Sequence, residues 1–177
     1  MPSITDPRLC WKSLDVSLMK PPTEYIGWLL NPGSLTKILR RRSRNNFSVL
    51  VEEESWWSGR STYLHRLLGK RYCAQVFWSR KVILMGYSEP WVVAHTLIPQ
   101  QGLRGRLRQV KRLKAKPLGA LLFKQRGIRR NSLDIVSTEW GWGRCSRYFF
   151  DGFPILVAEF FLPELINGNP RRTEVAK

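Results

Sequence analysis

The chain has 177 residues, a length typical of one domain that can bury a substantial core. Hydrophobic residues make up 43% of it, which excludes a disordered chain despite a formal net charge of +17. Residues 1–20 lack an apolar core of signal-peptide length, and no apolar run is long enough to span a bilayer, so we expect a soluble, cytoplasmic protein. The three Cys and two His have no metal-ligand spacing, so we expect neither a metal site nor structural disulfides.

Basic residues are concentrated in two stretches without acids. Eleven Lys or Arg lie between Glu89 and Asp134, and five more lie between Glu24 and Glu52. Such clusters can bind nucleic acid, form an ordinary solvated face, steer a small dianion, or attract an anionic membrane weakly. Composition leaves these alternatives open.

The N-terminal half begins with a lead-in, residues 1–22, that has no clear period and ends in two prolines. Thr23 can then cap a short helix, Asn31-Pro32-Gly33 breaks it, and Ser34 can cap a second helix through about Arg42. This hairpin lacks the second apolar face of a three-helix DNA-reading unit. We therefore expect it to form a lid or layer on a sheet.

The period of the hydrophobic pattern changes to that of strands from Asn46 onward. A second helical pair interrupts the strands at residues 103–113 and 117–123, and Asp151-Gly152 predicts a tight hairpin turn. The predicted strands are residues 47–53, 73–86, 91–99, 127–137, 143–150 and 153–162. The order predicts an α+β domain, residues 23–166, with an antiparallel sheet of about six strands, followed by a polar tail, residues 167–177.

Two charged residues stand alone on otherwise apolar strand faces. Arg80 alternates with Val76, Trp78, Val82 and Leu84, and Glu159 lies in a similar apolar series on the last strand. A charge on a buried face needs a partner, because leaving it unpaired typically costs about 3–5 kcal/mol. We expect these two side chains to pair with each other, with backbone groups, or with a ligand that has an anionic end and a hydroxylated end.

The second helix of each helical pair starts with a small or conformationally fixed residue followed by leucine. The first-turn amides near Leu35 and Leu118 have no helical partner, and the helix dipole favours an anion there. Most helix starts bind only water or a cap. The presence of Arg80 favours the anion-binding interpretation, because a guanidinium matches the geometry of a carboxylate.

Five blocks in the sequence resemble the chorismate lyase family, in order and with similar spacing from about Tyr25 to Leu165. They are Trp78-Ser79-Arg80-Lys81-Val82-Ile83-Leu84, Glu89-Pro90-Trp91 leading to Thr96-Leu97-Ile98-Pro99, Pro117-Leu118-Gly119-Ala120-Leu121-Leu122-Phe123, Trp142-Gly143-Arg144-Cys145-Ser146-Arg147 and Glu159-Phe160-Phe161-Leu162-Pro163. The segment Leu35-Thr36-Lys37 is similar to a lid segment of the family as well.

The resemblance implies a six-stranded antiparallel sheet with two helical-hairpin lids over a buried ligand cavity. It implies conversion of chorismate to 4-hydroxybenzoate and pyruvate, for ubiquinone biosynthesis, by a monomer without a cofactor. Arg80 and the amides of Leu35 and Leu118 would hold the ring carboxylate, and Glu159 would meet the ring hydroxyl. Arg80 and Glu159 are thus the expected catalytic pair.

One departure from the family pattern is His95, which stands where an arginine is expected. We expect a neutral core histidine there, although a role toward the pyruvyl carboxylate would alter turnover. Arg144 and Arg147 are expected to be structural or rim charges. Two other functions stay open, a non-catalytic sensor of small aromatic acids with the same fold and a basic nucleic-acid-binding protein, although no nucleic-acid-recognition motif accompanies the charge.

Overall fold

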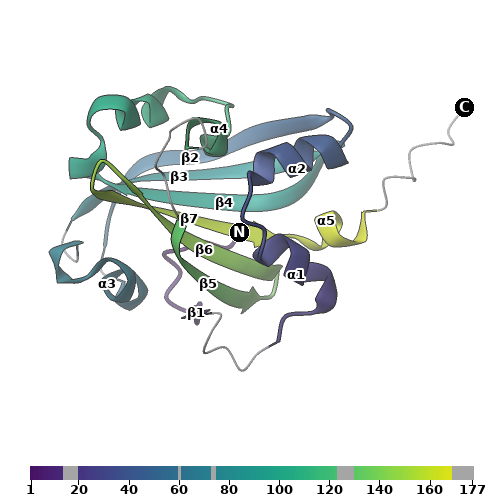
Figure 1. Ribbon diagram of the computed structural model, residues 1–177, viewed down its shortest axis with the longest axis horizontal. Coiled ribbons are helices and arrows are strands. Elements are labelled where there is room, and N and C mark those ends of the chain that lie inside the picture. The colour runs from purple at the N-terminus through teal and green to yellow at the C-terminus, as the bar shows by residue number, and fades with distance from the viewer. Residues whose placement is uncertain (14–19, 60, 73–74, 123–129, 169–177) are drawn as a thin grey trace, which may run out of the picture.

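The computed structural model describes residues 1–13, 20–59, 61–72, 75–122 and 130–168. Within these residues the chain forms one antiparallel sheet in the strand order β1-β5-β6-β7-β4-β3-β2, with short helices on both of its faces (Figure 1). The strands are β1 Lys12–Ser13, β2 Phe47–Ser58, β3 Val76–Gly86, β4 Glu89–Pro99, β5 Arg130–Thr138, β6 Gly141–Phe150 and β7 Phe153–Phe161. None of the helices in these ranges is both long and apolar enough to cross a membrane.

Strand prediction was correct for the six long strands, while the predicted count is one short of the seven described. The seventh strand, β1, is two residues long, lies in the expected lead-in and pairs with β5 at Ile135 and Asp134. Two residues are too few for an alternating pattern to reveal a strand. The predicted turn Asp151-Gly152 is present, with φ of 48° and 79° at its two residues, values that glycine adopts without strain.

The first helical pair is present where the sequence predicts it, as α1 Thr23–Leu29 and α2 Leu35–Arg42. The second pair differs: the expected helix at residues 103–113 is instead the 3₁₀ helix η4, Gly105–Arg112, which follows the short 3₁₀ turn η3, Gln100–Gly102. Gly105 falls inside the predicted helix. Its φ of +51° is incompatible with a regular α-helix at that position. The helix α4, Leu118–Leu122, follows, and the predicted end at Phe123 lies outside the described residues.

Besides η3, three short helices of the described residues were not predicted: α3 Thr62–Leu68, the 3₁₀ turn η2 Lys70–Tyr72 and α5 Pro163–Asn167. The start of α3 has a conventional cap, because the Ser61 hydroxyl accepts a hydrogen bond from the Leu64 amide at 3.3 Å. Its apolar residues pack on the sheet, and this tertiary contact stabilises a helix too short to be stable alone.

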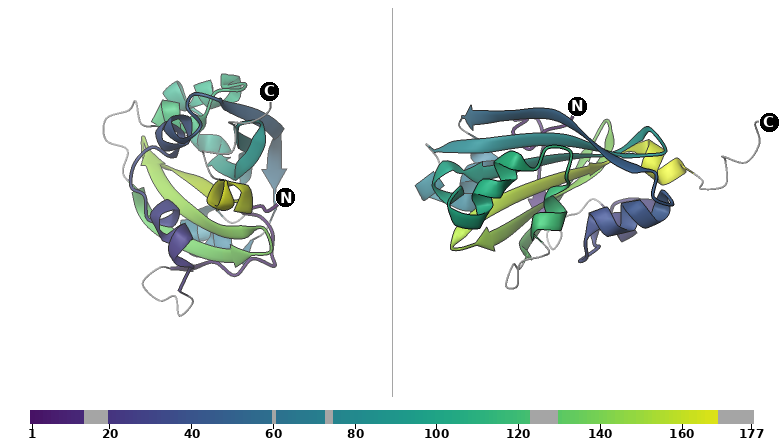
Figure 2. Two further views of the ribbon diagram at one scale, coloured as in Figure 1. Left: turned by 90° about the vertical axis from the view of Figure 1, so that its right-hand side faces the viewer. Right: turned by 90° about the horizontal axis from the view of Figure 1, so that it is seen from above.

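The sheet separates two cores. On one face, which we call the front face, α1, α2, η4 and α4 cover the sheet, and Figure 2 shows them together on one side. On the opposite back face, α3 and the N-terminal segment pack against Phe77, Leu97 and Phe160. Residues 1–13 of the lead-in are therefore part of the fold, with Ile4 and Trp11 in the back core.

A β-bulge in β2 changes which residues face the front core. Val51 lies opposite Val82, whereas Glu54 lies opposite Arg80, so one extra residue is accommodated at Glu52. Strict alternation would have placed Glu53 on the face of Arg80. The bulge places Glu54 there instead.

Candidate functional site

A small cavity lies between the front face of the sheet and the segments that cover it. Its volume is about 50 Å³, and it is bounded by the starts of α2 and α4 and by front-face residues of β3, β4, β6 and β7. All four residues that the sequence singled out, Leu35, Arg80, Leu118 and Glu159, line it. The other lining residues are Thr36, Val82, Leu84, Ala94, Thr96, Pro117, Gly119, Tyr148 and Val157.

Arg80 is the buried cation of this cavity, with only 2% of its surface exposed. Its Nη1 lies 3.0 Å from Oε1 of Glu54, and its Nη2 donates to the carbonyl oxygens of Lys114 at 2.6 Å and Lys116 at 3.2 Å. Burial lowers the pKa of Arg80 from its usual value, and the charge of Glu54 partly offsets this effect. A planar guanidinium held in this way can present its donors to a carboxylate that enters the cavity.

Glu54 is a site residue that sequence analysis missed. It belongs to the run Glu52-Glu53-Glu54, and the bulge at Glu52 decides which of the three meets Arg80. Its side chain is 24% exposed, so the ion pair lies at the edge of the cavity. The sequence carried no pattern that would reveal a bulge at this position.

Glu159 pairs with Arg144 and not with Arg80. Oε2 of Glu159 accepts a hydrogen bond from Nε of Arg144 at 2.6 Å, within the range of a charge-assisted bond. Arg144 is 1% exposed, so the expectation of a rim charge was wrong for this residue, while the expectation of a structural one agrees with its contacts. Its Nη1 also donates to the carbonyls of Trp28, Leu29 and Asn31 at the end of α1, at 2.8, 3.2 and 2.9 Å.

The two charged ends of the site lie on either side of β4. Arg80 is opposite Thr96 on β4, and Glu159 is opposite Ala94 on the same strand. Strands are spaced about 4.8 Å apart, so the two backbones are roughly 10 Å apart across the sheet. Side chains extending over Thr96 and Ala94 can approach the two ends of one aromatic ring.

The covering segments place two helix starts at the cavity. The first residue of α2 is Leu35, and Ser34 before it makes no side-chain cap, so the first-turn amides of α2 have no side-chain acceptor. The helix α4 begins at Leu118, directly after the buried Pro117. Both helix starts thus lie where an anion in the cavity can approach them.

His95 lies on the back face, away from the cavity. Its Nδ1 accepts a hydrogen bond from the Ile4 amide at 3.2 Å and lies 3.0 Å from Oγ of Ser3. The proton therefore resides on Nε2, which is 2.9 Å from Oγ of Ser79. Burial, together with the charge of Lys81, lowers the pKa of His95 to about 3. The expectation of a neutral core histidine agrees with this geometry, and His95 is not among the cavity-lining residues.

Comparison with known proteins identifies the family. The family model described as "Chorismate lyase" matches residues 7–169. A "Probable chorismate pyruvate-lyase" of Photobacterium profundum is 36% identical over 154 residues, covering 84% of this chain and 83% of that protein. A "Chorismate pyruvate-lyase" of Pectobacterium carotovorum is 33% identical over 149 residues, covering 82% of each chain. The chain belongs to the chorismate lyase family.

A solved structure of a GntR-family transcriptional regulator from Bacillus cereus aligns with a TM-score of 0.45 and 12% identity. The alignment covers 75% of this chain and 97% of that chain, a similarity too low to bear on function. In the described residues of this chorismate lyase family member, no group of three His, Cys, Asp or Glu side chains could share a metal ion.

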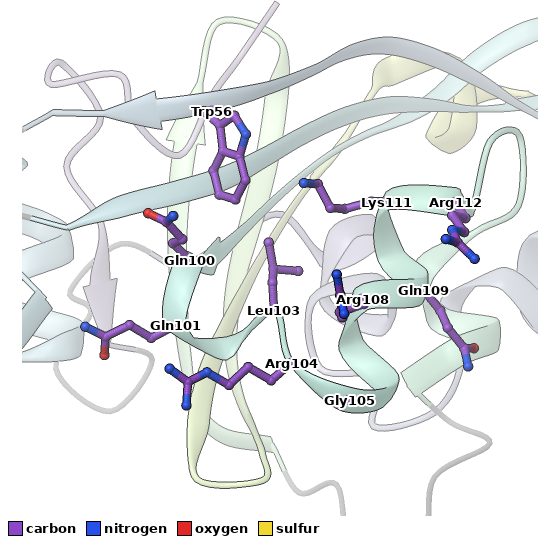
Figure 3. Close-up of a pocket in the computed structure, with 10 residues that line it drawn as sticks. All are labelled: Trp56, Gln100, Gln101, Leu103, Arg104, Gly105, Arg108, Gln109, Lys111 and Arg112. Carbon is purple, nitrogen blue, oxygen red and sulfur yellow. The ribbon is translucent and has the colours of Figure 1, made fainter.

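This member of the chorismate lyase family also has an open groove of about 1070 Å³ outside the cavity (Figure 3). Its walls are Trp56 of β2 and the basic strap, the name we give to residues 100–116, which contains η3 and η4. Lys111 reaches across the groove to β2, with its Nζ 4.6 Å from the ring centroid of Trp56 and 4.9 Å from that of Trp78. The strap continues to Lys114 and Lys116, whose carbonyls accept hydrogen bonds from Arg80 of the cavity, so the strap contacts both sites although they have no lining residue in common.

Proposed function

We propose that this protein converts chorismate to 4-hydroxybenzoate and pyruvate in the cavity of the front face. The observation that carries the proposal is the convergence of Arg80, Glu159 and two helix starts on one buried cavity, in a chain of the chorismate lyase family. The sensor and nucleic-acid alternatives are not favoured by the family or by the relatives.

In this proposal, Arg80 binds the ring carboxylate of chorismate, together with the amides of Leu35 and Leu118. Arg80 is held from both sides, by Glu54 and by the carbonyls of the basic strap, so its orientation is fixed before substrate arrives. Fixing one end of the ring limits its motion and aligns the bonds that break. The incoming carboxylate has to share or replace the partners that Arg80 has in the empty cavity.

Glu159 acts at the other end of the ring in this proposal. Its Oε2 is bound by Arg144, which holds the carboxylate in place, and the group faces the cavity that receives the ring hydroxyl. The C–O bond to the enolpyruvyl group breaks, the hydrogen on the hydroxyl-bearing ring carbon leaves, and the enolpyruvyl group takes up a proton to become pyruvate. The ring becomes aromatic, which supplies the driving force. General acid or base assistance by Glu159 would contribute roughly 10²–10⁴ in rate.

The covering segments act as lids in this proposal. The cavity of about 50 Å³ is smaller than the roughly 300 Å³ at the lower end for small-molecule sites, so a ring can enter only if α2 or residues 114–119 move. The same movement releases product. We therefore expect a pre-steady-state burst of product followed by slower turnover, because lid opening limits release. All parts of the site come from one chain, which supports a monomer as the active form.

The test of the function mixes purified protein with chorismate in chelator-treated buffer and follows both products. Equal amounts of 4-hydroxybenzoate and pyruvate are the expected result. Binding of 4-hydroxybenzoate without turnover would instead support the sensor, and an Arg80→Ala variant with wild-type turnover would remove Arg80 from the site.

A further inference from the structure

The two segments that cover the cavity carry most of the uncompensated positive charge of the described chain. Their exposed cations are Lys37, Arg40, Arg41 and Arg44 in and after α2, and Arg104, Arg108, Lys111, Arg112, Lys114 and Lys116 in the basic strap. None of the ion pairs among the described residues uses any of these ten side chains. Repulsion among these like charges raises the electrostatic free energy of the folded state. Binding of an anionic partner would lower it.

Both segments lie on the same side of the molecule. The helix α2 contacts α4, which follows the strap directly, and the view from above in Figure 2 shows α1, α2, η4 and α4 together in front of the sheet. The buried side chains of η4, Leu107 and Val110, point into the front core, while Arg108, Lys111 and Arg112 are exposed. The exposed cations therefore lie on the outer surface of this covering layer.

The covering layer also exposes two large aliphatic side chains, both at α1. Ile26 of α1 is 39% exposed, and Leu30, which caps the end of α1, is 44% exposed. Exposed aliphatic groups next to Lys and Arg are typical of surfaces that lie in a lipid headgroup region, where the cations bind phosphate and the apolar groups enter the acyl boundary.

Nucleic acid would match the charge but not the rest of the surface. Base stacking requires open aromatic faces. Trp56 is 46% exposed, but Lys111 lies over its ring and Trp78 packs edge-on against that ring at a centroid distance of 5.3 Å. Ile26 and Leu30 offer no stacking surface. The observations therefore favour a lipid surface over a nucleic acid.

We propose that the covering layer, formed by α1, α2 and the basic strap, docks on an anionic phospholipid bilayer. The lids that open the cavity then face the membrane, because Leu35 belongs to α2 in the docked layer and residues 117–119 follow the basic strap directly. Docking does not depend on catalysis: it would hold for this surface even if the chain turned over no chorismate.

The test is co-sedimentation with vesicles of phosphatidylcholine alone or with about 30 mol% phosphatidylglycerol, at low and high salt. We expect binding only to the anionic vesicles and release by salt. Arg108→Gln/Arg112→Gln should weaken the partition coefficient about 30-fold, since each basic residue near the surface contributes about fivefold. The matched control is Lys70→Gln/Arg71→Gln, which removes the same charge from η2 behind the sheet and should bind within about twofold of wild type.

The aliphatic contribution is tested separately with Ile26→Ser/Leu30→Ser. This variant should bind severalfold more weakly at every salt concentration, with an unchanged salt dependence, and circular dichroism should confirm that each variant is folded. Three results would overturn the proposal: no binding to anionic vesicles, equal losses in the strap and control variants, or capture of a single-stranded oligonucleotide by a protein that does not sediment with vesicles.

Discussion

At the scale of single residues, the site depends on a buried guanidinium whose partners differ from those expected. Arg80 and Glu159 could be found from the sequence, because each interrupts an apolar alternation that strand geometry makes interpretable. Of their actual partners, Arg144 was within reach of the sequence, because the predicted Asp151-Gly152 turn places it directly opposite Glu159 on the neighbouring strand. Glu54 was not, because its position opposite Arg80 depends on a bulge that alternation does not encode.

Removing the guanidinium should weaken carboxylate binding. We expect Arg80→Ala to lose about 1.5–3 kcal/mol of affinity for 4-hydroxybenzoate, the range for a charge-assisted hydrogen bond. Calorimetry measures this, and 4-hydroxybenzamide, which has no charge at that end, is the comparison ligand and should lose much less. Equal losses for both ligands would show that the substitution damages the cavity and not a specific contact.

Removing the competing carboxylate should have the opposite effect. Glu54 is bound to Arg80 in the empty site, so the Glu54→Gln variant should bind 4-hydroxybenzoate about three- to tenfold more tightly than the unmodified protein. Its affinity for 4-hydroxybenzamide should be unchanged. The melting temperature of the unliganded variant should be lower, because Arg80 loses a buried partner. Glu53→Gln is the matched control, because Glu53 pairs on the back face with Lys81. Weaker benzoate binding in the Glu54 variant would mean that the loss of orientation of Arg80 outweighs the loss of competition for it.

At the scale of elements, Arg144 joins β6 and β7 of the sheet to α1. It satisfies three carbonyls at and after the end of α1 and holds Glu159 at the same time. Lysine could not replace it, because one ammonium cannot reach all four acceptors as a planar fork does.

The prediction for Arg144→Met is that α1 loses its attachment. Breaking a buried ion pair typically costs about 3–5 kcal/mol, so amide hydrogen exchange in residues 23–31 should accelerate and overall stability should fall. Arg147→Met on the same strand, whose side chain binds the Leu67 carbonyl behind the sheet, should leave exchange in α1 unchanged. Slow exchange in α1 of the Arg144 variant would contradict the attachment.

The N-terminal segment is attached through His95, which predicts a dependence on pH. The pKa of His95 is about 3 in the folded chain against about 6.5 when unfolded, so below pH 6.5 the unfolded state binds a proton that the native state excludes. Stability should therefore be complete above pH 6.5 and fall as the pH decreases, by about 2 kcal/mol at pH 5.

Urea unfolding at both pH values measures this loss, and His95→Gln should remove most of the difference. His65, which is exposed on α3, provides the control variant His65→Gln, which should retain it. An undiminished pH dependence in the His95 variant would assign the effect to other groups.

At the scale of the whole molecule, the two faces of the sheet are covered by different parts of the chain. Its back face is closed by α3 and the N-terminal segment, while its front face holds the cavity under a basic cover. The α+β class and the six long strands followed from periodicity, and the first helical pair followed from the break at Asn31-Pro32-Gly33, although neither Thr23 nor Ser34 makes the expected side-chain cap. The remaining short elements depend on tertiary contacts, which a local pattern does not record.

The charge of the whole molecule should make its stability sensitive to salt. With a net charge of +17 and unpaired cations on one layer, screening should relieve self-repulsion, so the melting temperature should rise by several degrees between about 20 and 200 mM KCl. Arg108→Gln/Arg112→Gln should show a smaller rise than wild type. A melting temperature that falls with salt would indicate that attractive pairs dominate instead.

The bulge at Glu52 also bears on how copies of the chain behave toward one another. In the described sheet β2 is an outer strand with a free edge, the kind of edge to which a neighbouring molecule can add its own strand. The extra residue interrupts that ladder in its middle and leaves the exposed carboxylates of Glu52 and Glu53 there. The irregularity that selects Glu54 as the counter-ion of Arg80 thus also disfavours the addition of a strand from a second molecule, so a sequence change that straightened this strand should lower solubility.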